Sequence, residues 1–444
     1  MSGTMKQLAR EYGVVGAGGA GFPTHVKLDA KVEVLIINGA ECEPLMTVDQ
    51  VLMLTRAKEL FETLEQIRIE VGAGEAVLAV KAKHQEAVET VQAAAAAYPA
   101  IRICPLEDRY PAGDEYVLVY EVTGRLIPHS GLPLDCGVMV MNVETLWNMH
   151  EAQLGRPVTY KWVTIAGEVA HPGTYLLPIG ISAGDAIALA GGTGVPDACV
   201  IDGGPMMGKL KERSEPVTKT TKGLLVLPPD SPVVRSRLTP LEAILRQARS
   251  MCCQCHLCTD LCPRHLLGYE IEPNKTILAA SYSWSMGQTA IPQAYLCSEC
   301  GACDAYACPM GLSPRRVNQM LKGMMAKEKL PNPYKGRTAE LREERAYRRI
   351  PTKRLVARLG LSDYHSPAVL IEQAAEPKQL TLPLRQHAGA PSVPVVQAGD
   401  RVAAGALVAD IPEGALGSRI FTPLAGSVER VDQGVVVIRT GGTV

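Results

Sequence analysis

Two short runs of cysteine near the middle of the chain constrain its fold more than any other feature. The first run has the spacing C-x2-C-x2-C-x3-C followed by proline, and it comprises Cys252, Cys255, Cys258 and Cys262. The second has the spacing C-x2-C-x2-C-x4-C followed by proline, and it comprises Cys297, Cys300, Cys303 and Cys308. Two-residue spacers let a tight loop direct successive sulfur atoms at one centre. The fourth cysteine, before proline, typically ligates the other cluster in two-cluster proteins.

We therefore predict two [4Fe–4S] clusters with exchanged fourth ligands. The first is assigned to Cys252, Cys255, Cys258 and Cys308, and the second to Cys297, Cys300, Cys303 and Cys262. The extra residue before Cys308 departs from the usual spacing but leaves the ligand count intact.

A pair of zinc sites is the alternative reading of the same cysteines. Zinc favours two well-separated C-x2-C pairs, which close a tetrahedron around one ion. Four cysteines in three short steps, present twice, indicate iron–sulfur clusters instead. Cys253 cannot easily point at the same centre as its neighbour, so we interpret it as a packing residue or as a residue that contacts the cluster ligands.

Composition excludes several other classes of function. The chain has 444 residues, 47% of them hydrophobic, which predicts several globular domains. Its formal net charge of −1 and its 3 phenylalanines argue against nucleic-acid binding. No apolar run approaches the roughly 20 residues of a membrane span, and the N-terminus has no secretory pattern. We expect a cytoplasmic protein, in which 13 cysteines indicate metal or redox chemistry before disulfides.

The pattern along the chain predicts a multidomain α/β protein. Residues 1–155 alternate between strands near 32–38, 76–81 and 138–142 and helices near 50–66 and 84–97. A small α+β unit at 156–232, a helical cysteine-rich domain at 233–330 that starts with a helix near 237–250, and an all-β unit at 377–444 follow. Residues 331–376 read as a charged linker, and we expect its arginines (342, 345, 348 and 349) to be solvated, with a partner-docking patch as the lesser alternative.

A glycine-rich stretch at 13–21 is the second candidate site. Gly16, Gly18, Gly19 and Gly21 can let the backbone approach a phosphate group, although glycines also serve tight turns. The stretch does not have the G-x-G-x-x-G spacing after a strand, so it does not indicate a Rossmann site. Asp49 lies in an ordinary helix-start context, and we assign it no role.

Four motifs in the N-terminal region resemble one known family. GAGGAGFPTHVK (16–27), INGAECEPL (37–45), YPAGDE (110–115) and NVETL (142–146) resemble the flavin-binding subunit of respiratory complex I, and more closely the C subunit of the Rnf complex. This resemblance implies an FMN cofactor that is reduced by NADH. A flavin would link this two-electron donor to one-electron clusters.

The resemblance also implies which residues bind the flavin. Around the FMN phosphate it places Gly16, Gly18, Gly19, Gly21 and Lys27. Along the flavin and nicotinamide it places Asn38, Glu41, Glu43, Tyr110, Gly113, Glu115, Asn142 and Thr145. Ala17 and Ala40 depart from the complex I pattern.

The other domains resemble modules of the same family. Residues 166–192 resemble the β-grasp module of soluble-ligand-binding (SLBB) domains, and the C-terminal unit resembles a lipoyl-like barrel-sandwich hybrid without the hairpin for lipoyl attachment. The domain order and length resemble the cobalamin reductases of propanediol-utilisation microcompartments. This resemblance implies reduction of cob(III)alamin through cob(II)alamin to cob(I)alamin, inside a bacterial microcompartment, with an adenosyltransferase and shell proteins as candidate partners. An Rnf-like electron-transfer protein that passes electrons to a protein acceptor is the alternative.

Overall fold

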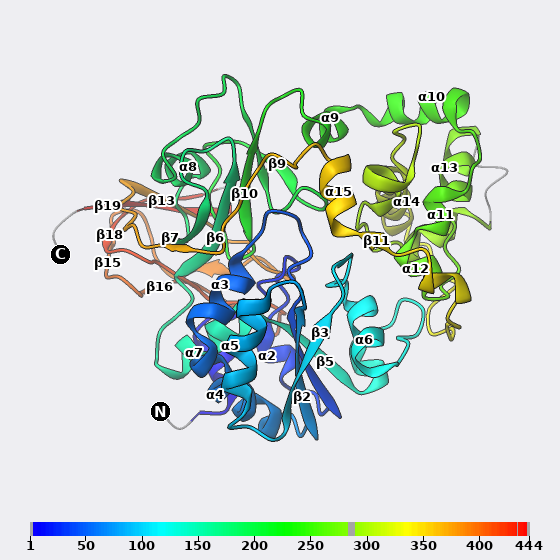
Figure 1. The fold of residues 1–444 in the computed structure, drawn as a ribbon. Coiled ribbons are helices and arrows are strands. Elements are labelled where there is room, and N and C mark those ends of the chain that lie inside the picture. The colour runs from blue at the N-terminus through cyan, green and yellow to red at the C-terminus, as the bar shows by residue number, and fades with distance from the viewer. Residues whose placement is uncertain (1–2, 283–288, 433, 442–444) are drawn as a thin grey trace.

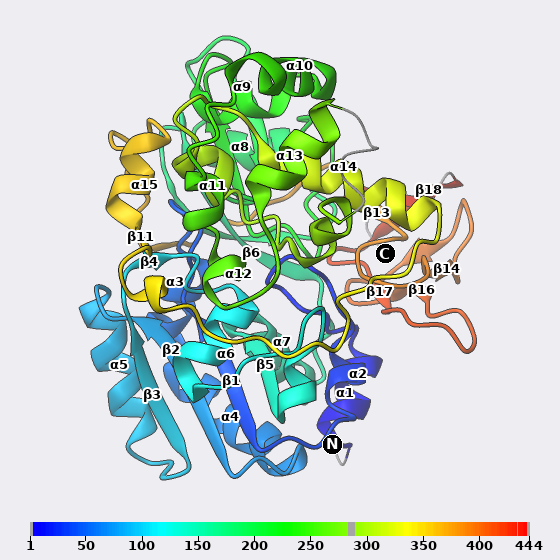
Figure 2. The ribbon, with the colours of Figure 1, turned by 90° about the vertical axis from the view of Figure 1, so that its right-hand side faces the viewer.

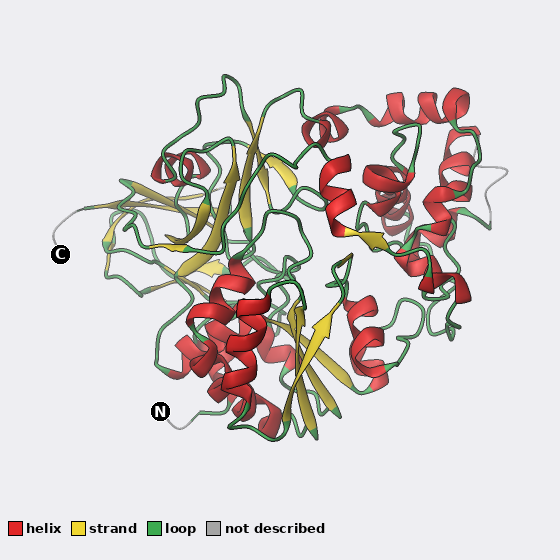
Figure 3. Cartoon of the chain, in the orientation of Figure 1, coloured by secondary structure: helices red, strands yellow, loops and turns green. Residues whose placement is uncertain are grey.

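The computed structural model describes residues 3–282, 289–432 and 434–441 (Figure 1). Four folded units follow one another along the chain: an α/β domain, a small β-rich domain, a helical domain with both cysteine runs, and a C-terminal barrel. Helices predominate in the cysteine-rich domain and strands in the β-rich domain and the barrel (Figure 3). Within these residues no helix has the length and apolar character needed to cross a membrane.

A parallel sheet forms the centre of the α/β domain. Its order is β3-β2-β1-β5, with β1 at Val34–Gly39, β2 at Glu75–Lys81, β3 at Ile101–Leu106 and β5 at Val138–Asn142. The runs of valine, isoleucine and leucine in β1, β2 and β5 are buried, as strands covered on both faces must be. The three predicted strands are therefore confirmed. β3 was not predicted, because it is a partly exposed edge strand without a continuous apolar pattern.

Helices cover both faces of this sheet. One face packs against α1 (Met5–Glu11), α3 (Val48–Thr55), α4 (Ala57–Glu70), α5 (Gln85–Ala95) and α7 (Val143–Gln153). The other face packs against α6 (Glu115–Thr123). The short elements α2 (Thr24–Lys27), β4 (Arg109–Tyr110) and η1 (Pro133–Cys136) complete the domain. Asn38 and Asn142 are register partners at the carboxyl ends of β1 and β5, the edge at which open parallel sheets bind ligands.

The β-rich domain is a mixed sheet with one helix. Its order is β12-β7-β6-β10-β8-β9, in which β6 is Tyr160–Gly167, β7 is Gly173–Pro178, β8 is Cys199–Asp202, β9 is Lys209–Lys211 and β10 is Gly223–Leu227. Helix α8 (Ala183–Leu189) begins at Ser182, whose hydroxyl accepts a hydrogen bond from the Asp185 amide. Alternating side chains of β6 and β7 pack against this helix.

The helical domain surrounds the cysteine runs. Its helices are α9 (Pro232–Leu238), α10 (Leu241–Met251), α11 (Leu257–Asp260), α12 (Pro263–Leu266), α13 (Pro273–Tyr282) and α14 (Pro314–Lys327), with short turns η3 (Ile291–Leu296) and η4 (Cys303–Ala307). The expected helix at 237–250 corresponds to α10. Figure 2 shows this domain stacked above the α/β domain.

The connecting segment, residues 331–376, crosses both preceding domains. It contains η5 (Glu343–Ala346), β11 (Ile350–Pro351), α15 (Thr352–Arg358) and β12 (Leu370–Ile371). β11 pairs with β4 of the α/β domain, and β12 pairs with β7 of the β-rich domain. Solvated arginines were expected here, and for two of them this is wrong. The Arg345 and Arg349 side chains are 11% and 27% exposed, because they form ion pairs with the α/β domain.

Two small sheets make up the C-terminal barrel. One has the order β13-β19-β18-β15 and the other β14-β16-β17, in which β13 is Gln379–Pro383, β14 is Val393–Pro394, β15 is Arg401–Val402, β16 is Leu407–Asp410, β17 is Ile420–Phe421, β18 is Gly426–Asp432 and β19 is Val435–Thr440. The barrel contacts the glycine-rich loop, because the Ala388 amide donates to the Gly21 carbonyl at 3.0 Å.

Candidate redox site

The two cysteine runs occupy equivalent loops of the helical domain. One loop follows α10 and the other follows η3. Gln254 and His256 of the first loop have φ values of 52° and 63°, and Glu299 and Gly301 at the corresponding positions of the second have 62° and 78°. Residues other than glycine rarely adopt this left-handed conformation. Both loops therefore curl in the same way, which places successive cysteines around one interior point.

Cysteines from different runs come together in two sets. Burial raises the pKa of Cys258 to about 12, and the neighbouring thiols that add to this rise are, in decreasing order, Cys308, Cys252, Cys255 and Cys262. Burial also raises the pKa of Cys303 well above its usual range, with further contributions from Asp304, Cys297, Cys300 and Cys262. We call the predicted ligands of the first cluster the Cys258 set (Cys252, Cys255, Cys258 and Cys308). We name the others the Cys303 set (Cys262, Cys297, Cys300 and Cys303).

The structure has space for a group at the Cys258 set. All four of its cysteines line one recess of about 370 Å³, whereas Cys262 does not. Backbone amides also donate to sulfur: the Leu312 amide to Cys308 Sγ at 3.4 Å, and the Glu299 amide to Cys297 Sγ at 3.3 Å. Such hydrogen bonds stabilise the thiolates that ligate a cluster. The donor sets thus fit the predicted clusters with the exchanged fourth ligand.

A π-helical turn accommodates the extra residue of the second run. The Cys308 amide donates to the Cys303 carbonyl at 3.1 Å, so the turn spans one residue more than an α-helical turn. Single π-turns commonly absorb one-residue insertions at functional sites. The longer spacing therefore leaves Cys308 beside the Cys258 set.

Within the described ranges, no three side chains of histidine, cysteine, aspartate or glutamate are arranged to hold a single metal ion. Cys253 is exposed at the rim of the recess of the Cys258 set. His265, near Cys262, uses its Nδ1 atom in a hydrogen bond with the Ile271 carbonyl at 2.9 Å.

The predicted flavin residues at the ends of β1 and β5 lie side by side. The Asn38 amide donates to the Gly113 carbonyl at 3.0 Å, and the Asn142 amide reaches the Asn38 carbonyl at 3.4 Å. A side chain at Gly113 would approach Cys42 Sγ to 3.2 Å. Gly113 therefore packs closely against Cys42 and Asn38, and the hydrogen bonds of the two asparagines fix the ends of β1 and β5 at this edge.

The glycine-rich loop covers this edge of the sheet. The Ala17 amide donates to the Thr145 hydroxyl at 2.9 Å, and a Cβ atom at Gly18 would lie 3.6 Å from Asn142 Cβ. Gly19 has a φ of 115° and would have open space around a Cβ atom. Gly18 and Gly19 are exposed, so their backbone is accessible to a phosphate group.

Lys27 and Glu115 lie at the same edge. The Lys27 ammonium donates to the Val140 carbonyl at 3.0 Å and lies 3.7 Å from the Glu115 carboxylate. Both side chains are about one-third exposed, at 33% and 37%. Lys27 can therefore meet an anion while it stays attached to β5.

Three other predicted flavin residues have partners elsewhere. Glu41 accepts the amides of Asp49 and Gln50 at 2.8 and 3.0 Å, at the start of α3. Glu43 accepts the amides of residues 206 and 207 in the β-rich domain, both at 2.9 Å. The Tyr110 hydroxyl donates to the Cys300 carbonyl at 2.5 Å. Glu43 and Tyr110 thus join the α/β domain to its neighbours, whereas Glu41 caps α3 within it.

A buried charge network beneath Asn142 was not found from the sequence. Asp49, to which no role was assigned, pairs with Lys222 of the β-rich domain at 2.5 Å and accepts the Asn142 side-chain amide at 2.9 Å. Burial, followed by repulsion from Asp49, raises the pKa of Glu41 to about 7, and Lys222 opposes this rise. No local pattern marks Lys222, because its partner is 173 residues away.

A second buried ion pair, between Glu144 and Lys161, lies next to the network. Both side chains are almost completely buried, at 0% and 1% exposure. The Glu144 carboxylate also accepts the Trp162 amide at 3.2 Å. This pair fixes the start of α7, and with it Asn142 and Thr145, against the β-rich domain.

The α/β domain contacts the Cys303 set directly. Besides the hydrogen bond from Tyr110 to Cys300, the Arg264 guanidinium lies 3.1 Å from the Asp114 carboxylate and 3.4 Å from the centre of the Tyr116 ring. Asp114 caps α6 and follows Gly113 in the predicted flavin motif. Arg264 follows Cys262 by two residues, so one buried ion pair joins the two candidate sites.

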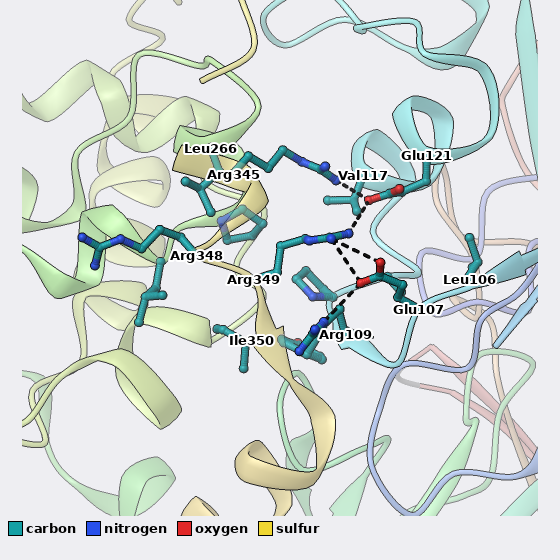
Figure 4. A pocket seen from close by; sticks show the side chains of 15 residues that line it. Leu106, Glu107, Arg109, Val117, Glu121, Leu266, Arg345, Arg348, Arg349 and Ile350 are labelled. Atoms are coloured by element: carbon teal, nitrogen blue, oxygen red, sulfur yellow. Dashed lines mark hydrogen bonds and ion pairs between the residues drawn. The ribbon is translucent and has the colours of Figure 1, made fainter. Parts of the chain in front are cut away.

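Another recess, of about 530 Å³, lies where the connecting segment crosses the α/β domain. Figure 4 shows Arg345 and Arg349 pointing toward Glu121 and Glu107, whereas Arg348 points away from them. All four arginines of the recess (Arg109, Arg345, Arg348 and Arg349) are paired with carboxylates of the same chain. We infer that these ion pairs hold the connecting segment against the α/β domain, and we call this recess the clasp recess.

Models of known families match all four units. The Nuo51 FMN-binding domain matches residues 9–151, the SLBB domain 162–210, the 4Fe-4S dicluster domain 251–313 and the RnfC barrel sandwich hybrid domain 362–443. The expected fold class is confirmed, and so are FMN and two [4Fe–4S] clusters as cofactors.

Curated relatives span nearly the whole chain. The cobalamin reductase PduS of Salmonella typhimurium strain LT2 is 43% identical over 438 residues, which are 98% of this chain and 96% of that protein. PduS of Citrobacter freundii is also 43% identical, with the same coverage. The C component of the Na(+)-translocating ferredoxin:NAD(+) oxidoreductase complex of Acetobacterium woodii is 35% identical over 59% of this chain and 58% of that protein.

Proposed function

Because the chain belongs to the family of PduS cobalamin reductases, we propose that it reduces cobalamin with electrons that come from NADH through FMN and both clusters. One observation carries the proposal: the Tyr110 hydroxyl, from a flavin motif, donates to the Cys300 carbonyl in a cluster loop at 2.5 Å. The flavin domain and the cluster domain are therefore in direct contact.

The chain's own residues would hold and orient the flavin. The backbone at Gly18 and Gly19 is accessible to the phosphate, and Lys27 supplies a cation at the same edge of the sheet. Asn38 and Asn142 hold the ends of β1 and β5 at this edge through the hydrogen bonds from their side-chain amides to Gly113 and Asp49. Bound there, FMN exchanges electrons in pairs with NADH and singly with a cluster. Burial of Cys262, Cys300 and Cys303 keeps water from the adjacent cluster site.

Anaerobic turnover tests the function. The purified chain, loaded with iron, sulfide and FMN, is mixed with NADH and hydroxocobalamin, and the corrinoid spectrum is followed. We expect NADH-dependent formation of cob(II)alamin and then cob(I)alamin. Turnover with a ferredoxin-like protein but not with cobalamin would support the Rnf-like alternative instead.

Substitution of Gly18 tests the flavin site. A Cβ atom there makes only an ordinary contact, at 3.6 Å from Asn142, so Gly18→Val should fold. Its side chain occupies the space in which the phosphate would approach the loop, and we expect FMN affinity to fall by about tenfold or more. Gly323→Ala, in α14 with open space around its Cβ, is the matched control. Unchanged affinity in Gly18→Val would assign the loop a structural role.

We also propose a location and partners. The resemblance to propanediol-utilisation enzymes supports a location in the cytoplasm within a bacterial microcompartment. Shell proteins and an adenosyltransferase would be its partners there. Fractionation of cells that express the tagged chain with these components tests this proposal. Recovery outside the microcompartment fraction would contradict it.

A further inference from the structure

We infer that electrons pass from the flavin to the cluster of the Cys303 set and then to the cluster of the Cys258 set, and that a corrinoid accepts them at the recess of the Cys258 set. The identity of the acceptor rests on the proposed function. The order of the clusters rests on the packing of the two sets, on their exposure and on the chemistry of the recess.

Cysteines of the Cys303 set lie in hydrophobic clusters that also contain residues of the α/β domain. Cys300 lies in a buried cluster with Tyr110, and Cys262 lies in another with Val117 of α6. Together with the ion pair between Arg264 and Asp114, these contacts place the Cys303 set beside the flavin motifs.

The Cys258 set packs within its own domain. The buried core that Cys252 and Cys308 join is built, among the residues that the structure describes, from positions 241–325 alone. Figure 1 shows the same arrangement, with α12 facing α6 and with α10 and α13 on the far side of the domain. An electron from the flavin therefore meets the Cys303 set first.

Exposure differs between the sets in the same direction. Cys262, Cys300 and Cys303 are buried, at 8%, 9% and 8%. Cys255 of the other set is exposed, and no member of that set is fully buried. An acceptor in solution can approach the Cys258 set more closely than the Cys303 set. This exposure makes the Cys258 set the point at which electrons leave the protein.

An acceptor would meet this recess from outside, because the space between its four cysteines belongs to the cluster. Its rim includes Gln254, His256, Pro309 and Met310, and no lysine, arginine, aspartate or glutamate is among its lining residues. Met310 is 39% exposed, which offers a soft apolar contact. A corrin ring with amide side chains matches such a rim. The clasp recess, in contrast, is lined by arginines and glutamates.

The proposed transfer balances in electrons and atoms. One NADH becomes NAD⁺ and releases one proton and two electrons. Each electron passes singly through the Cys303 set and the Cys258 set. Two molecules of aquocob(III)alamin each take one electron, lose the axial water and become cob(II)alamin.

Removing one ligand from each set tests the order of the clusters without cobalamin. We compare Cys255→Ala with Cys300→Ala by iron content and by electron paramagnetic resonance after addition of NADH, and then of dithionite. Each variant should lose about half of its iron. NADH should still reduce the remaining cluster in Cys255→Ala, whereas in Cys300→Ala the remaining cluster should be reduced quickly only by dithionite. A remaining cluster in Cys255→Ala that dithionite reduces but NADH does not would overturn the order.

A charge on the rim tests the acceptor site. Met310→Glu should raise the KM for cobalamin by about tenfold, because the carboxylate would lose its hydration when the ring binds, at a cost in free energy. Cluster reduction by NADH without cobalamin is measured in the same samples, so that an effect on the cluster is separated from an effect on the acceptor. Met324→Glu, at a methionine of similar exposure (43%) outside the recess, is the control. An unchanged KM in Met310→Glu, together with a raised KM in Arg348→Ala, would indicate that the acceptor binds at the clasp recess instead. Absence of cobalamin reduction in the unmodified chain would instead refute the proposed function and leave the cluster order standing.

Discussion

Replacing Lys222 with methionine would leave buried carboxylates without their cation. The Lys222 ammonium lies 2.5 Å from the Asp49 carboxylate, and the two side chains are 17% and 3% exposed. Asp49 would keep only the hydrogen bond from Asn142, at 2.9 Å. Removing one partner of a buried ion pair costs about 3–5 kcal/mol. Because Lys222 is not fully buried, we expect a loss of about 3 kcal/mol in the free energy of unfolding at about pH 8.

The size of this loss should depend on pH. The pKa of Glu41 is about 7 in the folded chain, above its ordinary value of 4.5. The folded state therefore binds a proton that the unfolded chain does not, and the stability that this gives is lost as the pH rises through 7. Lys222 lowers this pKa, so its removal raises the pKa further. At about pH 5.5 Glu41 is neutral with or without Lys222, and the loss should be smaller than at pH 8.

Urea denaturation at both pH values, followed by circular dichroism, measures these differences. Lys6→Met is the control, because Lys6 lies 2.5 Å from Asp29 while the two side chains are 45% and 68% exposed. The control should lose about 1 kcal/mol. If Lys222→Met lost no more than Lys6→Met at pH 8, or lost as much at pH 5.5 as at pH 8, the buried network would not have this energetic role.

Three further predictions concern the contacts between domains and the cluster ligands. Cys262→Ala should leave the same cluster spectrum as Cys303→Ala, and a spectrum that instead matches Cys258→Ala would show that the fourth ligands are not exchanged. Tyr110→Phe leaves a buried carbonyl of the cluster loop without its donor, so thermal unfolding should show a loss of about 1–3 kcal/mol, and an unchanged melting temperature would contradict this. Lys219→Met removes a buried ammonium that donates to three oxygens of the α/β domain and the barrel. It should cost about 2 kcal/mol and expose the barrel boundary to limited proteolysis, and a cleavage rate equal to that of the unmodified chain would argue against this.

Local patterns account for the parts of the fold and the site that could be predicted. Cysteine spacing predicted both cluster loops, because the ligands of a cluster come mainly from a few neighbouring residues. The buried strand before Asn38 was evident from its continuous apolar run. The exchange of Cys262 and Cys308 came from the known behaviour of the cysteine before proline, and the structure brings these residues to the expected sets.

Contacts between distant segments account for what was missed. The pair of Asp49 and Lys222 joins residues of two domains, and each residue alone has an ordinary local context. The arginines of the connecting segment resembled a solvated run because their carboxylate partners, Glu107 and Glu121, lie more than 200 residues earlier. Charge patterns within one segment do not reveal such pairs.

The contact between the barrel and the glycine-rich loop sets an order of assembly. The Gly21 carbonyl accepts the Ala388 amide at 3.0 Å, so the glycine-rich loop meets a partner that is synthesised after both cysteine runs. The iron-binding loops can therefore emerge before the glycine-rich loop gains its contact with the barrel, and a chain that stops before the barrel lacks this contact.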